Sequence, residues 1–129
     1  MSFVKGMHHV AIICGSYHRS KRFYTQVLGF AIVQETYRAE RQSYKLDLRL
    51  EDGTQIELFS FPNPPLRPSR PEAQGLRHLA LAVDDLESAI RHLHSHQVPT
   101  EAIRSDELTG KRFAFFSDPD QLPIELYER

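Results

Sequence analysis

The sequence has a single cysteine, no marked excess of either charge and no apolar run longer than a strand. Without a second cysteine, Cys14 cannot form an intramolecular disulfide, and residues 1–6 lack the apolar core of a secretory signal. A reducing cytoplasm is therefore the expected compartment, and no segment is expected to span a bilayer. Sixteen basic and seventeen acidic side chains give a net charge of −1, which argues against nucleic acid and membrane surfaces as partners.

What the chain does contain is enough for one compact domain, because 129 residues with 40% hydrophobic side chains can build a core. Cys14 continues the apolar run that starts at Val10, so a buried and inert thiol is favoured over a nucleophile.

The sequence reads as the same module written twice. Short apolar runs, turn residues and caps predict the order β-α-β-β-β in each half. Ser16 and Gly29 suit the two ends of the first helix, and Asp84 or Asp85 can cap the second. The first module, about 5–60, has strands expected at 7–13, 30–37, 44–50 and 54–60 around a helix at 17–28. The second, about 76–129, has strands at 77–83, 98–104, 111–117 and 123–128 and a helix ending near 96. A stiff connector, 61–71, holds five of the eight prolines.

The repeat places the same residue types at matching positions. Glu57 follows His9 by 48 residues, and Glu125 follows His78 by 47. The surrounding words also match: His-Val-Ala-Ile at 9–12 resembles His-Leu-Ala-Leu at 78–81, and Ile-Glu-Leu-Phe at 56–59 resembles Ile-Glu-Leu-Tyr at 124–127. Internal repetition of this kind indicates a duplicated architecture.

Strand alternation predicts that each of these four side chains lies on the sheet face opposite the aliphatic core residues. Neighbouring residues in a strand point to opposite faces, so His9 and Glu57 lie opposite aliphatic neighbours, as do His78 and Glu125. Two converging carboxylates on a sheet face would repel each other unless a cation compensates their charge. Two imidazoles and two carboxylates suit one divalent ion such as Ni, Zn, Co, Fe or Mn and leave coordination positions for substrate.

Simpler interpretations exist for each residue alone. A single strand histidine is more often a surface or hydrogen-bonded residue, and a single glutamate between aliphatics usually faces solvent. The repeated pattern favours the metal. Among the remaining histidines, His92 and His96 share a helical face, for which a solvated surface is favoured over a second site.

These modules resemble the vicinal oxygen chelate superfamily, also called the glyoxalase/bleomycin resistance/dioxygenase group. The resemblance covers essentially the whole chain through the words His-His-Val-Ala-Ile at 8–12, Arg-His-Leu-Ala at 77–80 and Asp-Pro-Asp at 118–120. Segments 56–62, 67–71 and 111–113 look like the bacterial YaeR-type branch. One departure is Gln121, where the family often has glycine.

The resemblance implies an α+β fold in which two tandem βαβββ modules form a cup-shaped mixed sheet with outer helices. It also implies one divalent metal held by His9, Glu57, His78 and Glu125, a small-molecule substrate with adjacent oxygens, and a homodimer. The modules of relatives pair within one chain or across two, and either arrangement remains open.

The full His-Glu-His-Glu set is that of glyoxalase I, which implies a lyase or isomerase with Glu125 as catalytic base and Glu57 second. The alternatives are an extradiol dioxygenase, a fosfomycin-type thiol transferase, or a metal-free protein that binds a small molecule. Two further groups of residues are candidates for contact with substrate. Phe59 and Tyr127 are candidates for the cavity wall, and the candidate anion partners are Lys45, Arg49, Arg38, Arg67, Arg70 and Arg112.

Overall fold

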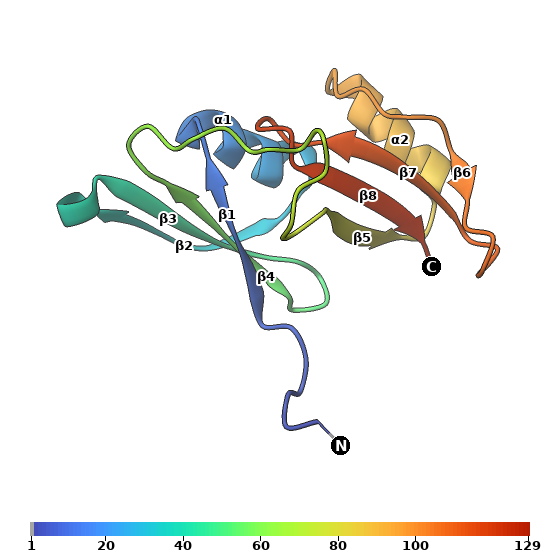
Figure 1. Cartoon of the computed structure of the whole chain (residues 1–129), viewed down its shortest axis with the longest axis horizontal. Coiled ribbons are helices and arrows are strands. Elements are labelled where there is room, and N and C mark those ends of the chain that lie inside the picture. Colours follow the sequence, from blue (N-terminus) through green and yellow to red (C-terminus); the bar gives the residue numbers. More distant parts are fainter. Residues whose placement is uncertain (1) are drawn as a thin grey trace. The chain divides into compact units, whose positions relative to one another are not determined.

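The computed structural model describes residues 2–129, which divide into two compact units, the first ending at Pro65 and the second spanning Leu66–Arg129. The boundary between the units falls inside the proline-rich connector. Each unit is one module with its own four-stranded mixed sheet (Figure 1). The predicted α+β fold with two βαβββ modules is confirmed. In the described part of the chain, no helix has the length and apolarity needed to cross a membrane.

The first module contains one sheet in the order β1-β4-β3-β2. The strands β1 and β4 run parallel, whereas β4 with β3 and β3 with β2 are antiparallel. Its elements are β1 (His9–Cys14), α1 (Tyr17–Arg22), the π-helical turn η1 (Phe23–Val27), β2 (Ala31–Arg38), the 3-10 turn η2 (Ala39–Arg41), β3 (Ser43–Arg49) and β4 (Gln55–Ser60).

The helix predicted at 17–28 is therefore present in two parts, because the α-helical pattern widens to π after Arg22. Gly29 ends this segment in the left-handed conformation with φ 77°. The amide of Phe30 donates to the carbonyl of Tyr24 at 3.0 Å, which closes the helix end as a C-terminal cap does.

The core of the first module lies on one face of its sheet. Ile12, Leu46, Leu48, Ile56 and Leu58 are all buried and alternate with more exposed neighbours. Cys14 ends β1 on the same face and is 1% exposed, so the thiol is part of the core as predicted. The opposite face of this sheet carries polar side chains together with Ala11, Ile13 and Phe59.

The second module repeats the topology in the order β5-β8-β7-β6, again with a parallel first pair and antiparallel neighbours. Its helix packs against β7 and β8. Asp85 is the cap, and its carboxylate accepts from the amide of Ser88 at 3.0 Å. The elements are β5 (Leu79–Val83), α2 (Leu86–Ser95), β6 (Arg104–Ser105), β7 (Arg112–Ser117) and β8 (Pro123–Glu128).

The strand predicted at 98–104 is wrong in extent. Only Arg104–Ser105 pairs with β7. Glu101 reaches the same edge through one hydrogen bond, which its amide donates to the carbonyl of Phe115. Pro99 has no amide hydrogen to donate, which is one reason why a continuous ladder does not form.

Arg112, one of the candidate partners for a substrate anion, is instead paired with two glutamates of its own module. Its guanidinium donates to both oxygens of Glu87 at 2.8 and 2.9 Å, and to Glu128 at 2.8 Å. These contacts join β7, β8 and α2, and they hold the pKa of Glu128 below its usual value. Arg112 is therefore occupied as a link between elements of the module.

Arg67 has a similar role in the connector. It donates to Ser69 Oγ at 2.9 Å, to the Leu76 carbonyl at 2.6 Å and to the Arg77 carbonyl at 3.2 Å. Ser69 in turn donates to the Gln121 carbonyl at 2.8 Å. The hydrogen bond from Ser69 to Gln121 thus fastens the second half of the connector to the turn between β7 and β8.

Candidate metal centre

The register of each sheet places a histidine and a glutamate on the face away from the core. In the first module, Ala11 pairs with Glu57, so the odd positions of β1 share a face with Glu57 and Phe59. In the second, Ala80 pairs with Glu125, which sets His78, directly before β5, on the corresponding face. The strand neighbour of each carboxylate is thus a small alanine.

In the first module, His9 Nε2 lies 3.5 Å from Glu57 Oε2. The other ring nitrogen, Nδ1, lies 2.9 Å from Nδ1 of His8, so the two edges of the His9 ring face different partners. Lys45 is on the same sheet face, and its ammonium lies 4.0 Å from Glu57 and 3.4 Å from Asp47. The side chain of Glu57 is 15% exposed, which means that the carboxylate is largely withdrawn from water.

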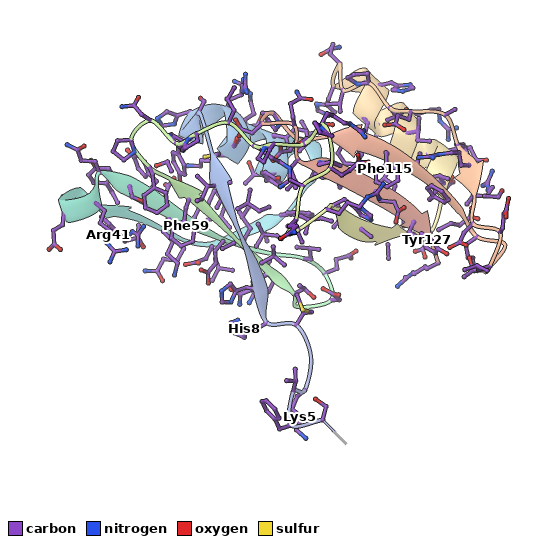
Figure 2. All side chains as sticks on the ribbon, in the orientation of Figure 1. Lys5, His8, Arg41, Phe59, Phe115 and Tyr127 are labelled. Atoms are coloured by element: carbon purple, nitrogen blue, oxygen red, sulfur yellow. The ribbon has the colours of Figure 1, made fainter. Side chains whose placement is uncertain are left out.

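In the second module, His78 Nε2 lies 3.9 Å from Glu125 Oε1, and the Glu125 side chain is 14% exposed. The cross-strand neighbour of Glu125 is Phe115, whose ring meets that of His78 edge to face at 5.0 Å. Figure 2 shows Phe115 on β7 and Tyr127 on β8. The surroundings of Glu125 are thus aromatic, whereas those of Glu57 include an ammonium group.

Each module, taken by itself, brings together one His–Glu pair. Among residues 2–129, neither module gathers three His, Cys, Asp or Glu side chains in a group able to hold a metal. Two ligands bonded to one ion at ~2.1 Å lie roughly 3.0–3.4 Å apart, depending on the angle at the metal. The observed 3.5 and 3.9 Å therefore fit a cation after small side-chain rotations. Each pair by itself is compatible with two of the donors of a divalent metal.

The two aromatic candidates for a cavity wall do lie on the face that carries the ligands. Phe59 is under the guanidinium of Arg38, with 4.9 Å from its carbon to the ring centre. The hydroxyl of Tyr127 donates to Asp106 at 2.9 Å and also contacts Thr109. The rings of His92 on α2 and of His96, which caps the end of this helix, are 4.7 Å apart on the exposed surface, as their spacing predicted.

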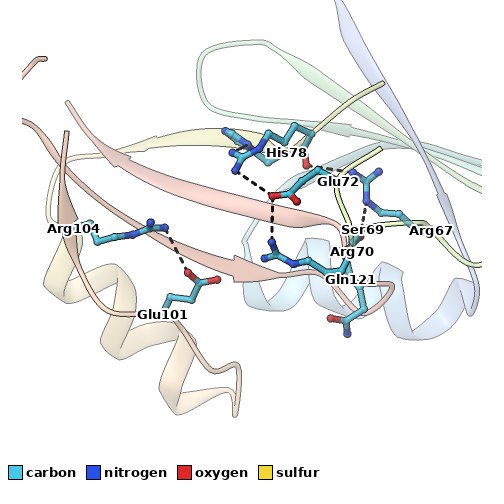
Figure 3. Close-up of polar contacts among 9 residues, drawn as sticks. Arg67, Ser69, Arg70, Glu72, His78, Glu101, Arg104 and Gln121 are labelled. Atoms are coloured by element: carbon cyan, nitrogen blue, oxygen red, sulfur yellow. Dashed lines mark hydrogen bonds and ion pairs between the residues drawn. The ribbon is translucent and has the colours of Figure 1, made fainter. Parts of the chain in front are cut away.

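The second module contains a cavity of about 200 Å³ that the sequence pattern did not reveal. It is bordered by the connector and by β7, and His78 is part of its wall (Figure 3). Arg67 and Arg70 were candidates for contact with substrate anions, but Arg77 and Arg104 were not. The concentration of arginines around the connector could have pointed to Arg77. Arg104 lies far from the connector in the sequence, and its position beside the cavity depends on tertiary structure. The arginines and acids of the wall are Arg67, Arg70, Arg77, Arg104, Glu72 and Glu101.

Comparison with known proteins extends the similarity over nearly the whole chain. Protein YwkD of Bacillus subtilis (strain 168) is 61% identical and protein YaeR of Escherichia coli (strain K12) is 58% identical, each over 98% of both chains. The resemblance to the YaeR-type branch is thereby confirmed. A 2-epi-5-epi-valiolone epimerase of an Actinomyces species is 28% identical over 93% of this chain and 77% of its own.

Solved structures show the same fold. The glyoxalase family protein from Enterococcus faecalis superposes with a TM-score of 0.91 at 46% identity, covering 98% of this chain and all of its own. The glyoxalase I of Leishmania major gives 0.74 at 26% identity, covering 97% and 87%. The model of the glyoxalase/bleomycin resistance protein/dioxygenase superfamily matches residues 6–126. The chain belongs to this superfamily.

Proposed function

We propose that the chain is a metal-dependent lyase or isomerase, similar to glyoxalase I, that acts on a small molecule with two adjacent oxygen atoms. His9 and Glu57 of one module and His78 and Glu125 of the other would hold one divalent cation, either within one chain or across a homodimer. The observation that carries the proposal is that an imidazole Nε2 lies near a partly buried carboxylate at the equivalent position of both modules.

A bound divalent cation would supply positive charge where negative charge develops on a substrate oxygen. The remaining chemistry is a proton transfer between neighbouring carbons, for which a carboxylate is a suitable base. We assign this role to Glu125, because its neighbours Phe115 and His78 leave it without the ammonium group that lies beside Glu57. The proton would be taken up on a Glu125 oxygen and returned to the adjacent carbon.

Two of the similar proteins support this class of reaction. One is by name a glyoxalase I and the other an epimerase. A lyase or isomerase of this kind and an epimerase share a step in which a proton leaves a carbon next to a carbonyl group. The substrate of this chain is expected to have the same acidic carbon.

The proposal is tested with untagged protein, because a histidine tag would bind metal itself. Elemental analysis is expected to find one divalent metal per chain, and thiol-dependent turnover of methylglyoxal is the first activity to measure. Glu125→Gln should keep most of the metal but lose turnover by about 10²- to 10⁴-fold, because the amide cannot accept the proton. Glu51→Gln, in an exposed turn, is the matched control and should change neither quantity.

Three outcomes would contradict the proposal in different ways. Full turnover in Glu125→Gln would remove the base from its assigned position. Protein without metal would favour the binding-protein alternative. Oxygen consumption with catechols, in place of isomerisation, would assign the chain to the dioxygenases.

A further inference from the structure

The cavity beside His78 has an excess of positive charge. Four arginines and two glutamates contribute to its wall, which leaves two positive charges more than negative ones when the histidine is neutral. Arg67 is committed to the Leu76 and Arg77 carbonyls and to Ser69, so it acts as part of the connector. The guanidinium groups of Arg70 and Arg104 remain, together with that of Arg77, whose Nη1 also lies 3.2 Å from Nδ1 of His78.

The ion pairs of these three arginines are long and exposed. Arg70 lies 3.5 Å and Arg77 3.9 Å from the same oxygen of Glu72, and Arg104 lies 3.5 Å from Glu101 (Figure 3). All three arginine side chains are more than half exposed. Exposed ion pairs of this length contribute little to stability. They can therefore be exchanged for a better-fitting anion.

Arg104 is held in place by rings. Its guanidinium carbon lies 5.1 Å from the centre of Phe113 and 5.5 Å from that of Phe115. Stacking uses the flat face of a guanidinium and leaves its N–H groups available at the edge. Phe115 also contacts His78. A single aromatic ring therefore lies between the Arg104 cation and a proposed metal ligand.

We infer that the substrate carries an oxyanion group, a carboxylate or a phosphate, which binds in this cavity to Arg104 with help from Arg70 and Arg77. The inference rests on the proposed function, since it assigns the adjoining His78 to the reacting end of the same molecule. The planar fork of a guanidinium matches two oxygens of either anion. Glu101 and Glu72 occupy the arginines when no anion is bound.

The test is a titration of the full-length chain with inorganic phosphate and, separately, with acetate, followed through the side-chain N–H signals of arginine by NMR. It is carried out on protein as purified and again after chelation. Binding that survives chelation belongs to the arginines and is independent of any metal. A failure of the metal proposal therefore leaves this measurement readable, and the reverse also holds.

Arg104→Gln should weaken binding of the preferred anion about tenfold, the effect of losing a charge-assisted hydrogen bond. Arg104→Lys should recover only part of it, because lysine has no fork. Glu101→Gln should tighten binding roughly two- to fivefold, since it removes the internal competitor. Arg91→Gln on the exposed side of α2 is the matched control and should have no effect.

Tighter binding of phosphate would assign a phosphorylated substrate, and tighter binding of acetate a carboxylic acid. If neither phosphate nor acetate binds, the inference is overturned. Equal losses in Arg104→Gln and Arg91→Gln would also overturn it, because the attraction would then be diffuse surface charge.

Discussion

Gln121 adopts a backbone conformation that glycine adopts with less strain. It sits in the turn before β8 with φ 70°, its amide donates to the Asp118 carbonyl at 3.0 Å, and its own carbonyl accepts from Ser69. The left-handed conformation costs roughly 1–2 kcal/mol for a residue with a Cβ. A glycine, which lacks a Cβ, would adopt this conformation without that strain.

Gln121→Gly should therefore stabilise the protein by about 0.5–1 kcal/mol, the strain removed less the greater chain entropy of unfolded glycine. Urea denaturation followed by circular dichroism measures the change. Gln121→Ala is the control, because it shortens the side chain but keeps the strain. Equal effects of both substitutions would show that the side chain and not the backbone sets the stability here.

For single residues, the sequence predicted the sheet face of a side chain wherever that face follows from one strand alone. Alternation was enough to place Glu57 and Glu125 opposite aliphatic neighbours. It could not place Arg112 in its pair with Glu87, because that contact joins a strand to a helix 25 residues away. It could not single out Arg104 either, since the aromatic rings beneath it belong to another strand.

Among the elements, α2 has the clearest local start signal. The Asp85 carboxylate satisfies the amide of Ser88, one of the amides that has no carbonyl partner at a helix start. Asp84, the other candidate cap, instead contacts Arg129. The choice between the two neighbouring aspartates depended on where the strand β5 ends, which hydrophobic pattern defines only to within a residue or two.

Asp85→Ala should destabilise the protein by about 1 kcal/mol, because the Ser88 amide loses its acceptor. Thermal unfolding of the two single variants provides the comparison. Asp84→Ala should have a smaller effect, since its partner is on the surface. A larger loss in Asp84→Ala would mean that the contact with Arg129 matters more than the cap.

The elements predicted least well are those whose form depends on a neighbour. The run at 98–104 has the composition of a strand, but a strand needs a row of donors facing a free edge. Pro99 interrupts that row, and the segment reaches β7 only at Glu101 and at Arg104–Ser105. The local amino-acid composition does not show how many backbone hydrogen bonds the segment can form with β7.

For the whole molecule, the repeated spacing predicted the two modules and the two His–Glu pairs. It did not fix the metal or the substrate, because one donor set and one fold serve several reactions. The cavity beside His78 is a property of the folded second module, formed where the connector returns to β7. Specificity of this kind depends on tertiary contacts and is not visible in a repeat.

If both pairs serve one ion, His9→Ala and His78→Ala should each lower the metal content to a similar low level. The double variant should be little worse than either single one, because the ion is already lost. Titration of metal-free protein with Co²⁺, followed by absorption, measures stoichiometry and affinity. Two ions per chain with independent losses would instead indicate one separate site in each module.

The contact between His8 and His9 links His8 to the orientation of a proposed metal ligand. His8 does not face Glu57, yet its ring occupies Nδ1 of His9 and leaves Nε2 turned toward the carboxylate. If His9 binds a metal through Nε2, its hydrogen resides on Nδ1, and Nδ1 of His8 accepts it in one of the two tautomeric arrangements of this contact. Substitutions at position 8 thus belong with ligand variants in any mutational survey, although the side chain itself would never bond to the ion.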